Sequence, residues 1–376
     1  MKPRLFIQFA GQGMKYMDEL RRLYSSVPAV QPFIDEAINA IKGELARYDD
    51  SECGLYKEGL AVDEWIKNPQ STPGFAYQLS SPISHCLIYL TQISNYLALV
   101  EEGMDHEALQ AHVHTVTGFS TGIMAAVLCA LDVNKDYLWK RAIDVQKMFF
   151  WQGARCQESI FKAGGRPFLD EKLHSTAEGS PSCMASIADI PRSKVDTLIA
   201  EFATQGKVYL AYKLTPMRCI VAGLPKDVAA FGAFIKERVE KKFTWRYVPS
   251  TIAAHSPLLQ HAFDNTPNDA VSVGLKFDKS ELKLPVLSND GGKDLRESDD
   301  IITDIMHAYF LQTGLWRNQL APLFANDGIT HVLDFGPGAG VAGLTEMHLA
   351  RFDIKVVRCS VPLERKMFIK QVLSNL

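Results

Sequence analysis

A serine between two glycines, in Gly118–Gly122 (GFSTG), is the first place in the sequence where the residue types suggest chemistry. The β-branched residues 113–119 before Ser120 predict a strand, and the apolar residues 121–132 after it predict a helix. A tight turn between a strand and a helix exposes the serine hydroxyl at the carboxyl end of a sheet. The pattern G-x-S-x-G also arises by chance, and a serine that only caps a helix is the alternative. The context favours a nucleophile, with the N–H of Thr121 free to stabilise an oxyanion.

A nucleophilic serine needs a base, and the ten histidines of the chain are the candidates. His255 directly follows a predicted strand and opens a new segment of the chain. His112 and His114 alternate on the strand that leads to the serine, and His331 lies on another predicted strand. A single histidine is more often structural than catalytic. Spacing alone therefore makes His255 the first candidate and leaves the other three open.

Two glycine turns follow predicted strands. Gln12 lies on the first turn, after the strand 4–9, where it could orient a substrate or support an oxyanion loop; an ordinary turn is the alternative. The second turn, DFGPGAG at 334–340, has neither the G-x-G-x-x-G order nor the lysine of a phosphate-binding loop. The sequence therefore argues against a dinucleotide-binding or P-loop function.

The composition is that of an ordinary globular protein, with 376 residues, 47% apolar and 22% charged, and a net charge of −3. This charge gives no indication of nucleic-acid or anionic-membrane binding. The apolar runs fall short of a membrane span, and the N-terminal apolar stretch is too short for a secretory signal. Seven scattered cysteines without a C-x-x-C pair predict reduced thiols, no metal site and a cytoplasmic location.

Strands that alternate with helices predict an α/β core with a mainly parallel sheet. The length predicts one large domain with an insertion, or two domains. The apolar patterns predict strands at 4–9, 113–119, 284–289, 330–336 and 354–361, and helices within 14–46, from Ser80 onward, at 121–132 and at 135–152.

A β-α-β-β-α-β order over 183–250 predicts a ferredoxin-like subdomain. We place this small subdomain at 181–252, as an insertion into a large core made of 1–180 and 253–376. The glycine-rich residues 153–182 before it predict an irregular segment.

Four motifs, FAGQG at 9–13, GFSTG, AAHSP at 253–257 and LDFGPGAG at 333–340, occur in the order found in acyl-carrier-protein transacylases. The chain resembles this malonyl/acyl transferase superfamily over nearly its whole length. It is most similar to the acetyl-transferase domain of fungal-type fatty acid synthase β chains and to starter-unit transacylase domains of polyketide synthases. The resemblance implies an α/β-hydrolase-like core with an inserted ferredoxin-like subdomain.

The resemblance also implies residue roles. Ser120 would attack an acyl thioester to form an acyl-enzyme, with His255 as the base of a Ser–His dyad. The N–H groups of Gln12 and Thr121 would form the oxyanion hole, and the main-chain carbonyl of Leu315 would orient the histidine. The acyl group would pass from acyl-CoA or an acyl carrier to the phosphopantetheine thiol of an acyl carrier protein, without a bound cofactor. The chain would act alone or within a larger synthase for fatty acids or polyketides.

Three positions depart from the malonyl-selective pattern. Val145 and Gln146 stand where those members carry an arginine that pairs with the malonyl carboxylate, and Lys147 and Arg155 are not placed to replace it. Burying a carboxylate without a guanidinium costs several kcal/mol, so we predict a neutral acyl group. Phe119 replaces the usual histidine, and Ala254 replaces a common phenylalanine. The smaller Ala254 would open room for a longer acyl chain, or would be compensated within the core.

Basic residues suggest where a carrier protein could bind. Lys213 stands where relatives tend to have asparagine, and it could meet a phosphopantetheine phosphate. Carrier proteins are acidic on their binding face, so Arg238, Lys241, Lys242 and Arg246 of the small subdomain could contact one. For any single residue, a solvated helix face is the simpler explanation.

Three functions stay open at this point. The first is the acyltransferase, and the second is a hydrolase that edits acyl thioesters on the same fold. A lipase-like hydrolase would need the order Ser…Asp/Glu…His with the histidine near the C-terminus, and the mid-chain His255 argues against it. The third is an inactive docking domain, which the Ser120 and His255 pair disfavours and the phenylalanine at 119 keeps open.

Overall fold

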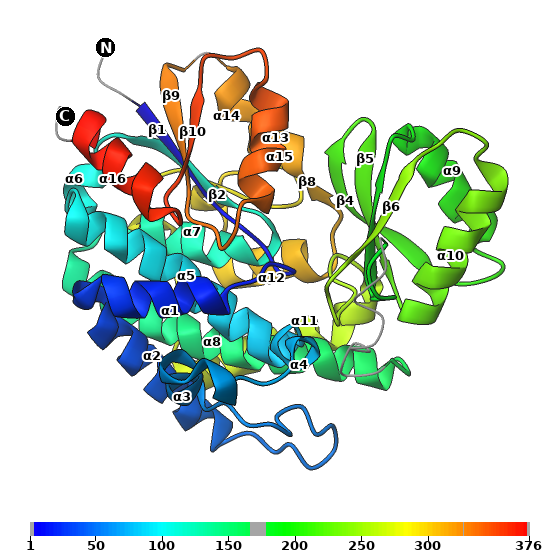
Figure 1. Ribbon diagram of the computed structural model, residues 1–376, viewed down its shortest axis with the longest axis horizontal. Coiled ribbons are helices and arrows are strands. Elements are labelled where there is room, and N and C mark those ends of the chain that lie inside the picture. The colour runs from blue at the N-terminus through cyan, green and yellow to red at the C-terminus, as the bar shows by residue number, and fades with distance from the viewer. Residues whose placement is uncertain (1–3, 166–177, 326, 374–376) are drawn as a thin grey trace.

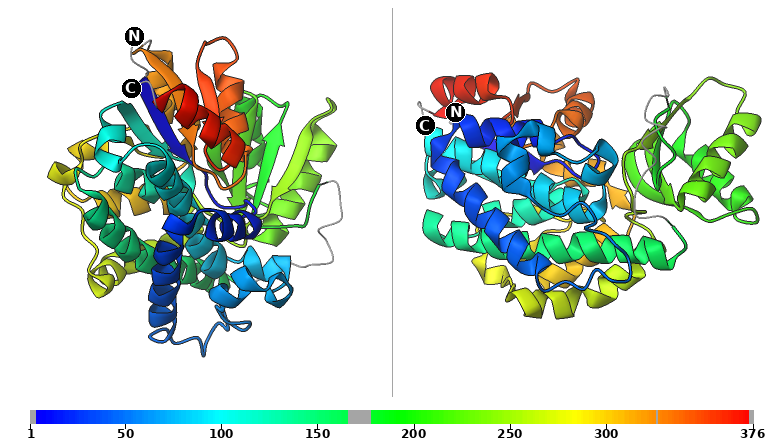
Figure 2. Two further views of the ribbon diagram at one scale, coloured as in Figure 1. Left: turned by 60° about the vertical axis from the view of Figure 1, so that its left-hand side comes forward. Right: turned by 60° about the horizontal axis from the view of Figure 1, so that its bottom comes forward.

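Two five-stranded sheets organise the chain, and helices surround the first of them (Figure 1). The computed structural model describes residues 4–165, 178–325 and 327–373. Figure 2 shows the two sheets in separate bodies that lie beside each other, with the second body the smaller. Part of the predicted irregular segment 153–182 lies outside the residues that the structure describes.

The first sheet is entirely parallel, in the order β10-β9-β1-β2-β7. Its central strand, β1, is buried from Leu5 to Phe9, as expected for a strand covered on both faces. The prediction of a mainly parallel sheet is confirmed. The strands are β1 (Arg4–Phe9), β2 (Val113–Gly118), β7 (Val286–Leu287), β9 (Ile329–Asp334) and β10 (Lys355–Arg358).

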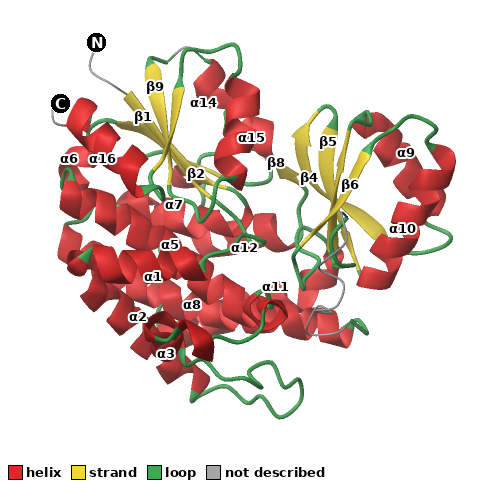
Figure 3. Cartoon of the chain, viewed as in Figure 1, coloured by secondary structure: helices red, strands yellow, loops and turns green. Residues whose placement is uncertain are grey.

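Helices make up the rest of the large body (Figure 3). The apolar helix α7 follows β2 and packs against β1 and β2, while the long helices α5 and α8 pack against each other. The main helices are α1 (Met17–Ser26), α2 (Gln31–Leu45), α5 (Ser81–Glu102), α7 (Ile123–Ala130), α8 (Lys135–Lys162), α11 (Gln260–Val273), α12 (Ile301–Phe310), α15 (Gly340–Leu349) and α16 (Pro362–Gln371). Shorter ones are α3 (Val62–Lys67), α4 (Phe75–Gln78), α6 (His106–Gln110), α13 (Trp316–Gln319) and α14 (Ala321–Phe324).

Helix α8 continues well beyond the predicted end at residue 152, so the irregular segment predicted from 153 is wrong as far as Lys162. Gly153 suggested a break, but it serves a close helix crossing instead. A Cβ at Gly153 would lie 2.6 Å from the carbonyl oxygen of Ser81 at the start of α5. The buried side chains of Ala154, Cys156 and Ile160 then extend the apolar face of the helix.

Helix α5 also differs from expectation. Among the described residues it is the one helix long and apolar enough to cross a membrane, so the prediction that every apolar run is too short is wrong here. Its apolar window is buried entirely inside the protein, as in the core helix of a globular fold.

The second sheet has the order β6-β3-β5-β4-β8. Its first four strands are antiparallel and alternate with two helices in the order β-α-β-β-α-β of ferredoxin-like units. We call the segment β3 to β6 the small lobe; the domain boundaries predicted at 181 and 252 stay a prediction. Its elements are β3 (Met184–Ala188), α9 (Arg192–Phe202), β4 (Val208–Thr215), β5 (Arg218–Gly223), α10 (Pro225–Arg238) and β6 (Thr244–Val248).

Strand β4 connects the small lobe to the large body. The edge strand β8 (Gly314–Leu315), which comes from the later part of the chain, pairs in parallel with Tyr212 and Lys213 of β4. Ala211, Tyr212 and Leu214 belong to the hydrophobic core of the large body, whereas Val208 belongs to the core of the small lobe. The two bodies therefore share a wall at β4, and the candidate site lies against that wall.

Candidate active site

Ser120 lies on a tight turn between β2 and α7, in the short 3-10 segment Ser120–Gly122. Its φ of 55° is in the left-handed region, which costs a non-glycine residue roughly 1–3 kcal/mol. The flanking glycines permit this turn, because a Cβ at Gly118 would overlap the backbone of Gly122. A Cβ at Gly122 would lie 2.5 Å from the carbonyl oxygen of Ala10. The turn predicted from GFSTG is therefore present, and it brings the hydroxyl to the carboxyl end of β2.

His255 faces this serine. Its Nε2 lies 3.0 Å from the Oγ of Ser120, and only 2% of the residue is exposed. On the other side of the ring, Nδ1 lies 2.8 Å from the carbonyl oxygen of Gln312 and 3.2 Å from that of Ala308. Since a carbonyl can only accept, Nδ1 carries the proton and Nε2 is free to accept the serine proton.

The carbonyl that orients the histidine comes from a different residue than predicted. The prediction of Leu315 is wrong. The carbonyl groups of Ala308, near the end of α12, and of Gln312, just after this helix, take that position. The N–H of Leu315 donates instead to the carbonyl of Asn289, and its strand pairs with β4. A main-chain carbonyl has no signature in the sequence, so only the local path of the chain could reveal it.

The environment of His255 keeps its ring neutral. Burial lowers its pKa to about 4, and the hydrogen bonds to the carbonyls of Gln312 and Ala308 only partly counteract that effect. A ring that is neutral at pH 7 can act as a base. His255 can therefore accept the Ser120 proton at Nε2 directly, because its ring is already neutral.

The loop after β1 lies against the serine turn. A Cβ at Gly11 would lie 2.7 Å from the carbonyl oxygen of Phe119 and 3.2 Å from the Cβ of Ser120. Among the described residues, no group accepts a hydrogen bond from the N–H of Gln12 or of Thr121. The side chain of Gln12 is engaged with α5 instead, because its Nε2 donates to Ser84 Oγ at 2.8 Å. Two free main-chain donors therefore lie on the two segments that meet at Ser120.

The three predicted pocket residues have different surroundings. Phe119 stacks on Tyr212, with ring centroids 4.2 Å apart, and packs edge-on against Trp316. Ala254 is buried beside His255. Gln146 is buried on the face of α8 that meets α5, where its Nε2 donates to the carbonyl of Cys86 at 3.2 Å and its Oε1 has no partner among the described residues. The structure thus places Phe119 and Ala254 next to Ser120 and His255 in the chain. Gln146 lies further away and contacts the backbone of α5 at Cys86.

The cations near α8 are already engaged. Arg155 pairs with Asp269 and Glu158, and Lys147 pairs with Asp144. Both interactions agree with the prediction that neither residue replaces the missing arginine. Of the basic residues expected on the small lobe, Arg238 lies near Glu237 and over the ring of Phe234.

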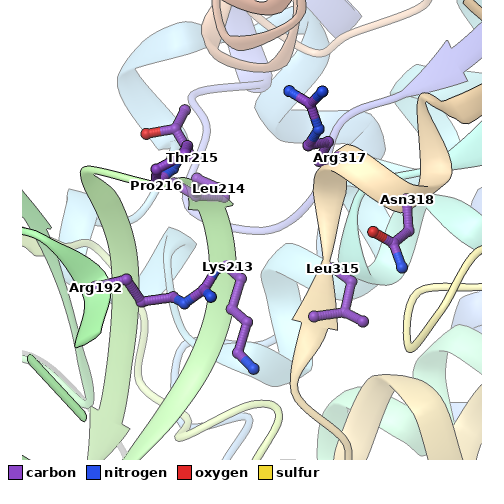
Figure 4. Close-up of a pocket in the computed structure, with 8 residues that line it drawn as sticks. All are labelled: Arg192, Lys213, Leu214, Thr215, Pro216, Leu315, Arg317 and Asn318. Carbon is purple, nitrogen blue, oxygen red and sulfur yellow. The ribbon is translucent and has the colours of Figure 1, made fainter. Parts of the chain in front are cut away.

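Lys213 does not face Ser120. Successive side chains of a strand point to opposite faces, and its neighbour Tyr212 packs on the ring of His255. Figure 4 shows Lys213 with Arg192 and Arg317 around a cavity of about 110 Å³, where β4 and β8 pair. None of the eight residues that line this cavity is acidic. A contact with a phosphopantetheine phosphate stays a prediction, at a place separated from the serine by β4.

Three polar residues of the site were missed by sequence analysis. Asn289, Gln319 and Tyr212 are buried and form hydrogen bonds with one another around the serine turn. Asn289 had a usable signal, because it ends the predicted strand 284–289 and polar residues at the carboxyl ends of parallel strands converge on one edge. Tyr212 and Gln319 lack such a signal, since they reach the site from the small lobe and from α13.

The sequence matches a known protein family and several curated relatives. Residues 7–255 match the family model described as "Starter unit:ACP transacylase in aflatoxin biosynthesis". The fatty acid synthase beta subunit TOXC of Cochliobolus carbonum is 26% identical over 90% of this chain, and the beta subunit aflB of Emericella nidulans is 27% identical over 88%. The chain spans 17% and 16% of the length of these two curated relatives.

Solved structures show the same fold. The acyl-carrier-protein S-malonyltransferase of Burkholderia pseudomallei superimposes with a TM-score of 0.70 at 17% identity, covering 98% of this chain and 99% of that one. A malonyl-transacylase in complex with its type II polyketide synthase acyl-carrier protein gives 0.68 at 18% identity, covering 99% and 100%. At such identities the likeness confirms the predicted α/β architecture.

Proposed function

The chain belongs to the starter unit:ACP transacylase family, and from that premise we propose that it transfers a neutral acyl group onto an acyl carrier protein. The donor is an acyl-CoA or an acyl carrier, and the acceptor is the phosphopantetheine thiol of the carrier. The observation that carries this proposal is the 3.0 Å contact between Ser120 Oγ and His255 Nε2 in a buried site.

In the first half-reaction, Ser120 Oγ attacks the thioester carbonyl while His255 Nε2 takes the hydroxyl proton. The carbonyl oxygen gains a negative charge, which the N–H groups of Gln12 and Thr121 stabilise. The C–S bond then breaks, the proton on Nε2 moves to the leaving thiolate, and an ester of Ser120 remains. In the second half-reaction the carrier thiol gives its proton to His255 Nε2 and its sulfur attacks the ester carbonyl. The ester C–O bond then breaks, the proton on Nε2 moves to Ser120 Oγ, and the acyl group leaves as a thioester of the carrier.

The preference for a neutral acyl group rests on Gln146. A malonyl carboxylate buried near this helix would find an amide rather than a guanidinium, and an unpaired buried carboxylate costs several kcal/mol. Phe119 and Ala254 add apolar surface close to His255. A neutral, apolar acyl group is the chemistry that these surroundings favour.

A panel of radiolabelled acyl-CoAs, with and without carrier protein, tests this function. We expect label on the wild-type protein that moves only to the carrier, and loss of labelling by about 10³-fold or more in Ser120→Ala. Label released to water would support the hydrolase, and absence of labelling would support a docking domain. An active Ser120→Ala protein would exclude the acyl-enzyme.

A further inference from the structure

We propose that Asn289 and Tyr212 are positioning residues for the nucleophile: Asn289 fixes the backbone of Ser120, and Tyr212 ties that contact to the small lobe. Neither residue touches the reacting atoms. The inference rests on the proposed role of Ser120, and it adds that the serine is correctly aimed only while β4 is in place.

Asn289 binds both backbone groups of Ser120. The Ser120 N–H donates to Asn289 Oδ1 at 3.0 Å, and Asn289 Nδ2 donates to the Ser120 carbonyl at 2.9 Å. Asn289 is 0% exposed and lies two residues after the end of β7, the strand next to β2. Because Ser120 has a φ that a non-glycine residue rarely adopts, a fixed partner for both of its peptide groups holds it in that conformation.

The donors around Asn289 determine how its amide is oriented. Its Oδ1 lies near the Ser120 N–H, the Tyr212 hydroxyl at 2.8 Å and Gln319 Nε2 at 3.2 Å. All three groups can donate, so the atom at that position is the acceptor oxygen. Gln319 Nε2 also lies 2.9 Å from Thr117 Oγ1, which anchors the same network to β2.

Tyr212 brings the small lobe into this network. Its hydroxyl has one proton and two acceptors, Asn289 Oδ1 and Gln319 Oε1, at 2.8 and 2.7 Å. Its ring stacks on Phe119 and stands edge-on to His255, with centroids 4.9 Å apart. One side chain of β4 therefore contacts the residue before the nucleophile, the ring of the base and the partner of the nucleophile.

The place of the Tyr212 ring is itself fixed by the chain that follows His255. Gly314 of β8 lies so close to this ring that any Cβ there would overlap it. Since β8 pairs with β4 at Tyr212, backbone pairing and ring packing act at one point. A displacement of β4 from the large body would thus disturb the direction of Ser120 Oγ toward His255.

The test compares Asn289→Ala and Tyr212→Phe with the wild-type protein. Each has a matched control: Gln110→Ala, whose buried amide donates to the carbonyls of Cys129 and Leu131, and Tyr89→Phe, whose buried hydroxyl donates to the carbonyl of Ala142. The readout is the rate at which a fluorophosphonate labels Ser120, per active site counted by the final extent of labelling. This probe reports the serine even if no thioester is transferred, so it separates this proposal from the proposed function.

We expect Asn289→Ala to lower the labelling rate about 100-fold and Tyr212→Phe about tenfold, as for a displaced reacting group. With an acyl-CoA that is accepted, kcat should fall and KM should stay within about twofold, since substrate contacts are unchanged. Both controls should keep the wild-type rate. If Asn289→Ala does not fold, Asn289→Ser and Tyr212→Phe carry the test. Rates within twofold of wild type in the folded variants, or a wild-type serine that the probe does not label, would overturn the proposal.

Discussion

His255 Nε2 lies 3.0 Å from Ser120 Oγ, although 135 positions of the chain and the entire small lobe separate the two residues. Three non-glycine residues of the described chain have a positive φ, and two of them form this pair, with φ of 55° and 59°. Backbone strain of this kind concentrates at functional sites, where the surrounding structure maintains it. The strain at both partners supports a site in which the fold sets the direction of each side chain.

The first prediction concerns the pH dependence of acylation. The pKa of His255 is lowered to about 4 by burial, so the ring is neutral and able to accept a proton at every pH well above 4. We expect the labelling rate of Ser120 to be flat between about pH 8 and 5 and to fall as the pH decreases through about 4. Rapid mixing into each buffer, with circular dichroism as a check on folding, measures this. A midpoint near 6.5, the value of a solvated histidine, would contradict it.

The strands were predictable where the local pattern and the long-range structure agree. The predicted strand 4–9 has the observed bounds of β1, because its run of apolar residues is buried along the strand. The strand predicted at 284–289 shrinks to β7, Val286–Leu287, and β8 was missed altogether. Both short strands exist only because a neighbouring strand offers them partners, which a local pattern does not reveal.

The same division applies to the site. Ser120 and His255 lie in short motifs, so the sequence could name them before their distance was known. The carbonyl partner of His255 was placed at Leu315 and belongs to Gln312, because a main-chain group leaves no trace in residue types. Tyr212 could not be named because it reaches the site from the small lobe, and a register shift between Leu210 and Tyr212 also interrupts the regular pairing of β4 with β5.

The second prediction concerns the glycine after the nucleophile. In Gly122→Ala the new methyl group would lie 2.7 Å from the carbonyl oxygen of Phe9, the last residue of β1, and 2.5 Å from that of Ala10, the next residue. We expect α7 to shift, acylation to fall by about 100-fold, and stability to fall by about 1–3 kcal/mol. Gly343→Ala in α15 is the control, because its methyl group meets no atom within 4 Å. That control should gain about 0.5–1 kcal/mol in urea unfolding, and a fully active Gly122→Ala enzyme would refute the close approach.

The third prediction concerns acyl selectivity. Gln146→Arg would place a guanidinium where the amide now donates to the carbonyl of Cys86. A charged hydrogen bond contributes about 1.5–3 kcal/mol, so we expect kcat/KM for malonyl-CoA, relative to a neutral acyl-CoA that the wild type accepts, to rise about tenfold or more. Gln146→Met, similar in size and uncharged, separates the effect of charge from that of shape. No rise in the malonyl ratio would indicate that this position lies outside the acyl pocket.

The fourth prediction concerns stability and Asp334, which lies in the glycine turn beside the loop that carries Gln12. Asp334 accepts hydrogen bonds from Gln8 Nε2 at 2.6 Å and from the N–H of Gly336 at 3.0 Å, and the carbonyl of Gly336 accepts from Ala10. Burial raises its pKa to about 7, so the folded protein holds a proton there that an unfolded chain releases near pH 4. Its contribution to stability is therefore complete below about pH 4 and is lost as the pH rises through 7.

The buried histidines His85 and His255 act in the opposite direction. Burial lowers the pKa of each to about 4, so unfolding between about pH 4 and 6.5 takes up a proton at each ring, and their contribution is lost as the pH falls. In Asp334→Asn the acidic contribution disappears and the histidine contributions remain. Between pH 5 and 6 the free energy of urea unfolding should then rise with pH more steeply than in the wild type, by about 1.4 kcal/mol per pH unit. Asp353→Asn, at an exposed position, is the control for the loss of one carboxylate. Parallel pH curves for Asp334→Asn and wild type would mean that Asp334 is ionised in the folded protein, with Gln8 and Gly336 binding a carboxylate.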